Sequence, residues 1–151
     1  MKMNIEVMPS CSIAYIRQTG AYGKGNVETM EQLKHWANAN NLMNSKTVIF
    51  GIAHDDPQTT TPEDCRYDAC ILIAEQGFPT GDKVQHGEIV GGKYAVFTVK
   101  HTAEAMEQAW EEIFPLLSET GDRLDTTRPI LERYAAEQVA QCLCEICVPI
   151  R

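Results

Sequence analysis

The sequence has little positive charge and no long apolar run. Among its 151 residues, 13 Lys and Arg stand against 21 Asp and Glu, which gives a formal net charge of −8 at pH 7. Proteins that hold phosphate backbones need clustered Lys and Arg, so direct nucleic-acid binding is not expected. No run of about eighteen apolar residues occurs, and residues 1–8 contain no apolar signal core. We therefore expect a cytoplasmic protein that does not enter a membrane.

Motifs of the common enzyme classes are also missing. The sequence contains no G-x-S-x-G or Walker A segment, and Gly20, Gly23 and Gly25 do not form a dinucleotide-binding fingerprint. The four histidines are scattered and lack a zinc-protease spacing. No motif therefore calls for a cofactor. If the chain is an enzyme, Glu132 with an aromatic hydroxyl or a water is the most economical acid/base device.

The six cysteines do not indicate a disulfide framework or a metal site. Without a secretory signal, they are expected to remain reduced. Cys144 and Cys147 form a C-x-x-C pair, but their segment is predicted to be a strand. Residues three apart on a strand point to opposite faces, so the two thiolates should not share one zinc ion. We expect small buried side chains instead.

Hydrophobic periodicity predicts an α+β fold in a single domain over residues 1–151. A helix should begin at Asn26, a good N-cap, and extend to about Asn40. Gly77, Pro79 and Gly81 mark a connector, after which the element order repeats. The predicted strands are 4–18 (bent near Pro9), 47–53, 66–73, 88–99 (broken at Gly91-Gly92), 130–134 and 140–149, and the second helix is 103–119.

The repeated order divides the chain into two pseudo-repeats, residues 1–78 and 83–151. Asp68-Ala-Cys-Ile-Leu-Ile73 matches Glu145-Ile-Cys-Val-Pro-Ile150 in its acid, its cysteine and its final isoleucine. A βαββ unit is too small to bury both faces alone, so two units should associate with pseudo-twofold symmetry into one antiparallel sheet. We expect two helices on one side of this sheet. A central groove for a ligand should lie on the other side or at the seam between the halves.

Glu132 is the most informative single residue. In an extended segment, Ile130, Glu132 and Tyr134 share one face. A carboxylate there is costly to desolvate unless a cation or a hydrogen-bond donor meets it. It could be a solvated edge acid, or it could pair with Arg133 or Arg128. Alternatively, it forms the floor of a pocket whose aromatic walls and negative charge together attract lipophilic cations.

Aromatic side chains are the candidate walls of such a pocket. Tyr134 is the best of them, because it shares a face with Glu132. The others could equally fill the core, as aromatic side chains commonly do. They are Tyr22, Tyr67, Tyr94, Trp110 and Phe114.

Several segments together resemble the GyrI-like small-molecule-binding family, and the likeness extends over essentially the whole chain. The first half carries Asp55-Asp-Pro57, Pro62-Glu63 and Arg66-Tyr-Asp68, which resemble the stand-alone gyrase inhibitors of the family. The second half carries Gly91-Gly-Lys-Tyr-Ala-Val96, the helix with Trp110, Pro129-Ile-Leu-Glu-Arg-Tyr134 and Glu145-Ile-Cys-Val-Pro-Ile150.

The resemblance implies a duplicated βαββ fold in which a carboxylate at the position of Glu132 meets cationic drugs. It also implies that Glu145 lines the same sheet. Related regulators carry a DNA-binding module, for which no sequence is left here, so a free-standing protein is expected. Arg133 departs from the resemblance, because an apolar residue that faces the helices is usual there.

Three functions stay open. The leading hypothesis is a non-enzymatic protein that binds a hydrophobic or cationic small molecule and inhibits or modulates DNA gyrase, without metal or cofactor. The alternative, also suggested by the resemblance, is a hydrolase of strained electrophilic toxins of the cyclopropanoid type, with Glu132 as its catalytic group. A groove that serves only protein interaction is a third possibility. The predicted ligand-binding residues are Glu132, Tyr134, Tyr22, Tyr67, Trp110, Phe114 and Glu145.

Overall fold

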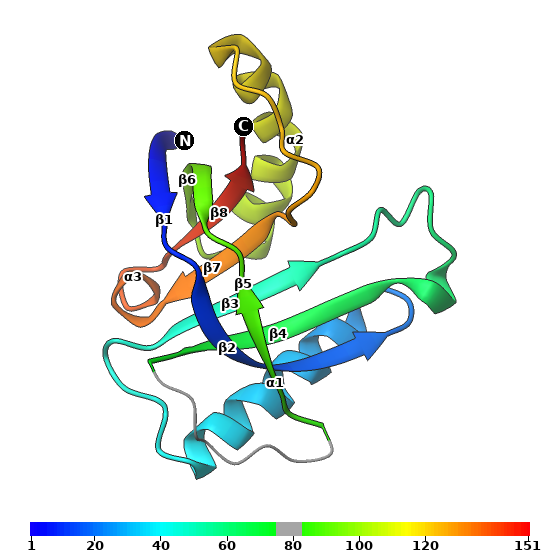
Figure 1. The fold of residues 1–151 in the computed structure, drawn as a ribbon, viewed down its shortest axis with the longest axis vertical. Helices are drawn as coiled ribbons and strands as arrows, with labels where there is room; N and C mark the ends of the chain where they lie inside the picture. The colour runs from blue at the N-terminus through cyan, green and yellow to red at the C-terminus, as the bar shows by residue number, and fades with distance from the viewer. Residues whose placement is uncertain (75–82) are drawn as a thin grey trace.

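Eight antiparallel strands form one sheet in a computed structural model, which describes residues 1–74 and 83–151. The strand order is β1-β6-β8-β7-β3-β4-β2-β5 (Figure 1). The predicted antiparallel α+β architecture is confirmed. The strands are β1 Lys2–Met8, β2 Cys11–Thr19, β3 Val48–Ala53, β4 Arg66–Ile73, β5 Gln85–Ile89, β6 Gly92–Lys100, β7 Leu131–Ala135 and β8 Leu143–Pro149. The helices are α1 Lys24–Ala39, α2 Ala103–Thr120, the short α3 Ala136–Val139 and the 3-10 turn η1 Pro62–Asp64.

The strand order has pseudo-twofold symmetry. If each of β1 to β4 is exchanged with its counterpart among β5 to β8, the strand order reads the same in reverse. The counterparts β3 and β7 pair with each other at the centre of the sheet. Each half also gives one strand to the other, because β1 pairs with β6 and β5 pairs with β2. The predicted strand 4–18 therefore bends near Pro9 into two strands that lie far apart in the sheet order.

The two bends that exchange these strands contact each other. The Gly91 amide donates a hydrogen bond of 2.8 Å to the Ser10 hydroxyl. A Cβ atom at Gly91 would lie 2.4 Å from the Ser10 nitrogen and 2.5 Å from the Met8 oxygen. Only glycine allows this approach of backbone to backbone. The break predicted at Gly91-Gly92 is thus the place where the two crossovers meet.

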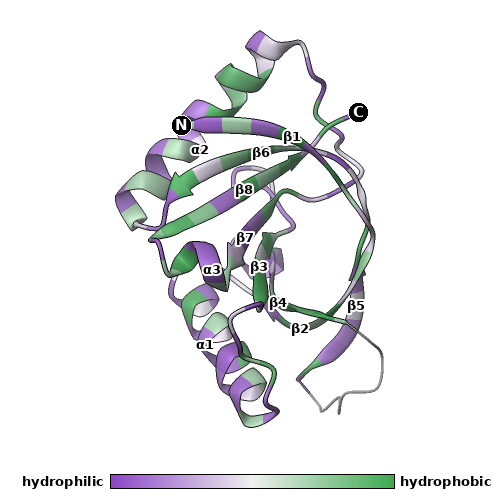
Figure 2. Cartoon of the chain, turned by 90° about the vertical axis from the view of Figure 1, so that its left-hand side faces the viewer, coloured by the Kyte–Doolittle hydropathy of each residue, from purple (hydrophilic) through white to green (hydrophobic). Residues whose placement is uncertain are grey.

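Both long helices lie on the same side of the curved sheet, one over each half (Figure 2). α2 packs on β6 and β8, whereas α1 packs on β2 and β4. Asn26 is not the N-cap of α1, contrary to the prediction. The helix begins two residues earlier because Gly23, at φ 129°, makes the turn into it and is its N-cap. The prediction also missed α3, a single turn between β7 and β8.

Charged side chains are buried on the face of the sheet away from the helices. Arg133 donates to Glu145 on β8 at 2.8 Å and to both carboxylate oxygens of Glu6 on β1 at 2.9 and 3.1 Å. Arg133 therefore faces away from the helices, and the expectation that this position faces them is wrong. In the other half, Asp68 is 4% exposed and accepts hydrogen bonds from Arg17 at 2.7 and 2.8 Å, with His54 2.7 Å away.

Arg133 is expected to be a main electrostatic support of β1. Arg133→Ala should lower the free energy of unfolding at pH 7 by about 3 kcal/mol, because the buried Glu145 loses its partner. The hydrogen bond from Arg133 lowers the pKa of Glu6. Its stabilisation is therefore present above the pKa of an unfolded glutamate and is lost as the pH falls through the folded value.

Urea unfolding at pH 7 and pH 3 measures both effects. Arg66→Ala, which breaks a more exposed pair with Asp55 (3.0 Å), is the control and should cost no more than about 1 kcal/mol. Equal losses in the two variants, or a loss that does not shrink at pH 3, would contradict this role of Arg133.

Candidate functional site

A cavity of about 630 Å³ opens at the seam between the two halves, on the side that carries the helices. Its size is within the range of small-molecule sites. The seam was one of the two places where a groove was expected; the face away from the helices, the other place, is packed with a core cluster. The cavity is lined by Asn26, Val27, Met30, Glu31, Lys34, Met43, Thr47, Ile49, Tyr67, His101, Tyr134, Ala136, Val139 and Ala140.

The floor of the cavity is built by the central pair of strands and by β4. Tyr134 lines the cavity, and its hydroxyl donates a short hydrogen bond to the carboxylate of Glu132. Glu132 lies opposite Gly51 in the β3–β7 pairing. A Cβ atom at position 51 would come within 2.8 Å of the Tyr67 hydroxyl. The missing side chain of Gly51 therefore makes room for Tyr67 in the floor.

Burial sets the electrostatics of this floor. It raises the pKa of Glu132, and the hydrogen bond from Tyr134 opposes this effect. Burial and the neighbouring Glu132 charge raise the pKa values of Tyr67 and Tyr134. The same two causes raise the pKa of Cys144 to about 11. The phenols thus stay protonated donors at neutral pH, and one desolvated carboxylate lies a single hydrogen bond behind the cavity wall.

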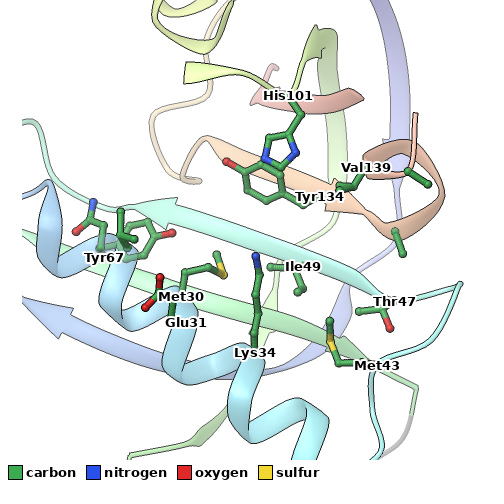
Figure 3. Close-up of a pocket in the computed structure, with 14 residues that line it drawn as sticks. Met30, Glu31, Lys34, Met43, Thr47, Ile49, Tyr67, His101, Tyr134 and Val139 are labelled. Carbon is green, nitrogen blue, oxygen red and sulfur yellow. The ribbon is translucent and has the colours of Figure 1, made fainter. Parts of the chain in front are cut away.

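The walls above this floor are aromatic on one side and flexible on the other. The His101 imidazole lies over the Tyr134 ring, with 5.2 Å between the ring centroids and 46° between the planes. Facing them across the cavity, α1 presents Met30, Glu31 and Lys34 (Figure 3). Unbranched methionines adapt to irregular ligands. Neither His101 nor Met30 was predicted, because each comes from a separate element that only the fold brings to the seam.

Asn26 is a polar residue of the cavity lining, and its expected role was to cap the first helix. Its amide oxygen is buried and has no hydrogen-bond partner among the described residues. A buried acceptor without a partner is costly. The oxygen is closed to solvent, so Asn26 lines the cavity through its other atoms.

The remaining predicted ligand-binding residues lie elsewhere. The Tyr22 hydroxyl donates to the Arg66 carbonyl at 2.8 Å and accepts from the Asp55 amide at 3.1 Å, so it anchors the loop after β3. Trp110 is half-buried and packs against the core cluster beneath α2, and Phe114 is 42% exposed on the same helix. Glu145 is on the opposite face of the sheet, where Arg133 holds it. Of the seven predicted residues, the structure brings Glu132, Tyr134 and Tyr67 together.

The simpler alternatives for Glu132 do not match its position. Its strand, β7, is central rather than at an edge. Arg133 points to the other face, and Arg128 pairs with Asp125 at 2.9 Å. Tyr94, another candidate wall, is buried away from the cavity and donates to the Val90 carbonyl at 2.9 Å.

Metal ligands are not assembled within residues 1–74 and 83–151, where no group of three or more His, Cys, Asp or Glu side chains could hold an ion. Cys144 and Cys147 point to opposite faces of β8, as predicted, and contribute to different core clusters. In the same ranges, no helix has both the length and the apolar character needed to cross a membrane.

A family model for the GyrI-like small molecule binding domain matches residues 1–151. The chain belongs to this GyrI-like family. Among its relatives, the "SPbeta prophage-derived putative transcriptional regulator YosT" of Bacillus subtilis (strain 168) is 44% identical, and the match covers the full length of both chains. A DNA gyrase inhibitor of Pantoea sp. (strain At-9b) is 23% identical over 100% of this chain and 99% of its own.

Solved structures show the same GyrI-like fold. The C-terminal domain of EcmrR superposes with a TM-score of 0.76 at 14% identity, over 99% of this chain and 97% of that domain. SAV2435, solved bound to tetraphenylphosphonium, gives a TM-score of 0.62 at 15% identity, over 100% and 94% of the two chains. At these identities, the likeness concerns the fold alone.

The raised pKa of Glu132 predicts that this GyrI-like protein loses stability at its site when the carboxyl group ionises. A group whose folded pKa is raised contributes stability below its unfolded pKa, and this contribution is lost as the pH rises through the folded value. Glu132→Gln should therefore match the wild type near pH 4 and become the more stable protein towards pH 7.

Thermal or urea unfolding across this pH range tests the prediction. Glu111→Gln, at an exposed position in the middle of α2, serves as the control and should follow the wild type throughout. A Glu132→Gln variant that is less stable than the wild type at pH 7 would show that the ionised carboxylate is well compensated.

Proposed function

We propose that the seam cavity binds apolar aromatic molecules, including lipophilic cations, and that this binding is the function of the protein. One observation carries the proposal: a desolvated carboxylate lies one hydrogen bond behind an aromatic wall, in a cavity of ligand size. The ring of Tyr134 offers its negative face, and Glu132 adds a full charge in a medium of low polarity. Both terms favour a positive ligand without requiring it to touch Glu132.

The rest of the lining supports a broad rather than a narrow choice of ligand. Met30 and Met43 provide flexible contacts that accept different shapes. Lys34 at the rim, opposite the aromatic wall, weakens the attraction for cations and keeps neutral aromatic compounds in range. The bound tetraphenylphosphonium of SAV2435 supplies a suitable probe.

Tetraphenylphosphonium should bind to the wild-type protein and bind about tenfold more weakly to Glu132→Gln, which corresponds to about 1.4 kcal/mol. Neutral triphenylphosphine oxide should bind both proteins with similar affinity, because its binding depends on the walls and not on the charge. Isothermal titration calorimetry measures the four affinities, with Glu111→Gln as the charge-matched control.

Two results would contradict the proposal. The first is no binding of either probe to the wild type at millimolar concentration. The second is an equal loss of tetraphenylphosphonium affinity in Glu111→Gln and Glu132→Gln, which would mean that overall charge, and not the site, attracts the cation.

Hydrolysis is the second candidate, favoured by the contact of the Tyr134 hydroxyl with a carboxylate of raised pKa. The Tyr134 hydroxyl, which lines the cavity, would take a proton from water and pass its own proton to Glu132 as the water oxygen bonds to a strained ring carbon; the ring bond would break, and the released carbon would take up a proton. A cyclopropane-bearing alkylating compound is the test substrate. Turnover by the wild type that is absent in Glu132→Gln would favour hydrolysis over binding alone.

We also propose DNA gyrase as a protein partner, supported by relatives that are named DNA gyrase inhibitors. Their identities are 23% and 24%, and YosT, at 44%, is named as a "putative transcriptional regulator". In a supercoiling assay, a molar excess of the protein should reduce the rate of purified gyrase at least threefold. If supercoiling is unchanged and no complex forms, the gyrase proposal fails while the binding proposal stands.

A further inference from the structure

Strand β1 presents an unusual edge. It is the first strand in the sheet order, so one of its edges has no partner strand among the described residues. Val7 and Ile5 are 75% and 47% exposed on one face of β1. Soluble proteins normally protect such edges with short strands, charge or proline, because a long apolar edge pairs with other chains. The opposite edge strand, β5, is shorter, with five mainly polar residues, whereas β1 has seven residues and carries its charges, Lys2 and Glu6, only on the face opposite Val7 and Ile5.

The residues of β1 are complementary to themselves in the antiparallel direction. With Asn4 at the centre, Lys2 lies opposite Glu6, and Met3 lies opposite Ile5. The exposed Val7 then meets Met1, which is itself 50% exposed. Opposite residues of an antiparallel pair share one face, so the charges meet on one side of the sheet and the apolar side chains on the other.

We propose that two copies of this chain associate through β1, antiparallel and centred on Asn4, so that one sheet continues across the dimer. The contact is isologous, as expected of a twofold dimer, and it contains two Lys2–Glu6 pairs. Arg133 already orients the Glu6 carboxylate through both oxygens, yet 41% of the Glu6 side chain remains exposed to a second cation. The cavity at the β3–β7 seam lies several strands away and stays open.

Charge selects this register over its neighbours. A twofold axis perpendicular to the sheet allows shifts of two residues only, because a shift of one would place opposite residues on different faces. A shift in one direction sets Lys2 against Asn4, and a shift in the other sets Glu6 against Asn4. In both cases the two charges lose their opposite partners. The Asn4-centred register is the one that pairs them.

Sedimentation equilibrium over about 1 to 500 μM tests the association. One strand from each copy buries less area than a permanent dimer does, so a dissociation constant in the micromolar range is expected. Lys2→Glu, which sets Glu against Glu6, and Val7→Lys, at a side chain that is largely exposed, should each weaken the dimer at least tenfold. Lys46→Glu, the same charge change in the exposed loop before β3, should leave it unchanged.

A cross-link tests the register itself. In a Cys142→Ser background, which removes the exposed thiol, Asn4→Cys should form a disulfide-linked dimer under mild oxidation. Lys2→Cys should not form this cross-link, because position 2 of one copy lies opposite position 6 of the other, and the two cysteines are therefore four residues apart along the strands. A monomer at every concentration, a dimer unaffected by Lys2→Glu and Val7→Lys, or equal cross-linking of the two cysteine variants would each overturn the proposal.

Discussion

The antiparallel pairing of β3 with β7 is the contact on which the site and the sheet both depend. It joins the two halves through four opposed residue pairs, from Val48 with Ala135 to Gly51 with Glu132. Because this pairing is central, the backbone of β7 has a partner strand on each side, and its side chains are buried or half-buried. A carboxylate at this place is desolvated by the architecture itself, and the same architecture provides Tyr134 and Tyr67 as neighbours.

Symmetry explains the supports of the fold, and a departure from symmetry explains the site. Asp68 and Glu145 occupy matching positions and are both buried and held by an arginine on the face away from the helices. Asp68 lies opposite Ile52, and Glu145 lies opposite Arg133, so one residue earlier Gly51 corresponds to Glu132. Glu132 on β7 supplies the one carboxylate at the seam. Gly51 on β3 has no side chain, and this leaves space for the Tyr67 phenol.

The features that depend on local periodicity could be predicted from the sequence. The order of strands and long helices, the bends near Pro9 and Gly91 and the shared face of Glu132 and Tyr134 follow from spacing along one element. Contacts between residues of separate elements could not be predicted in this way. His101, Met30 and Asn26 reach the cavity from three separate places in the chain, and Arg133 finds one of its partners 127 residues away. Too many aromatic residues were predicted in the pocket for the same reason, because Trp110, half-buried against the core, and Phe114, at the surface, cannot be told from pocket residues in the sequence.

The exchange of strands between the halves has a consequence for synthesis on the ribosome. β1 is translated long before its partner strand β6, because Lys2 pairs with Thr98. At roughly 5 to 20 residues per second, the interval is on the order of 5 to 20 seconds. During that time the strand with the most exposed valine of the fold has no neighbour. The nascent chain is therefore most vulnerable to aggregation before its second half has emerged, and chaperone binding would matter most in that interval.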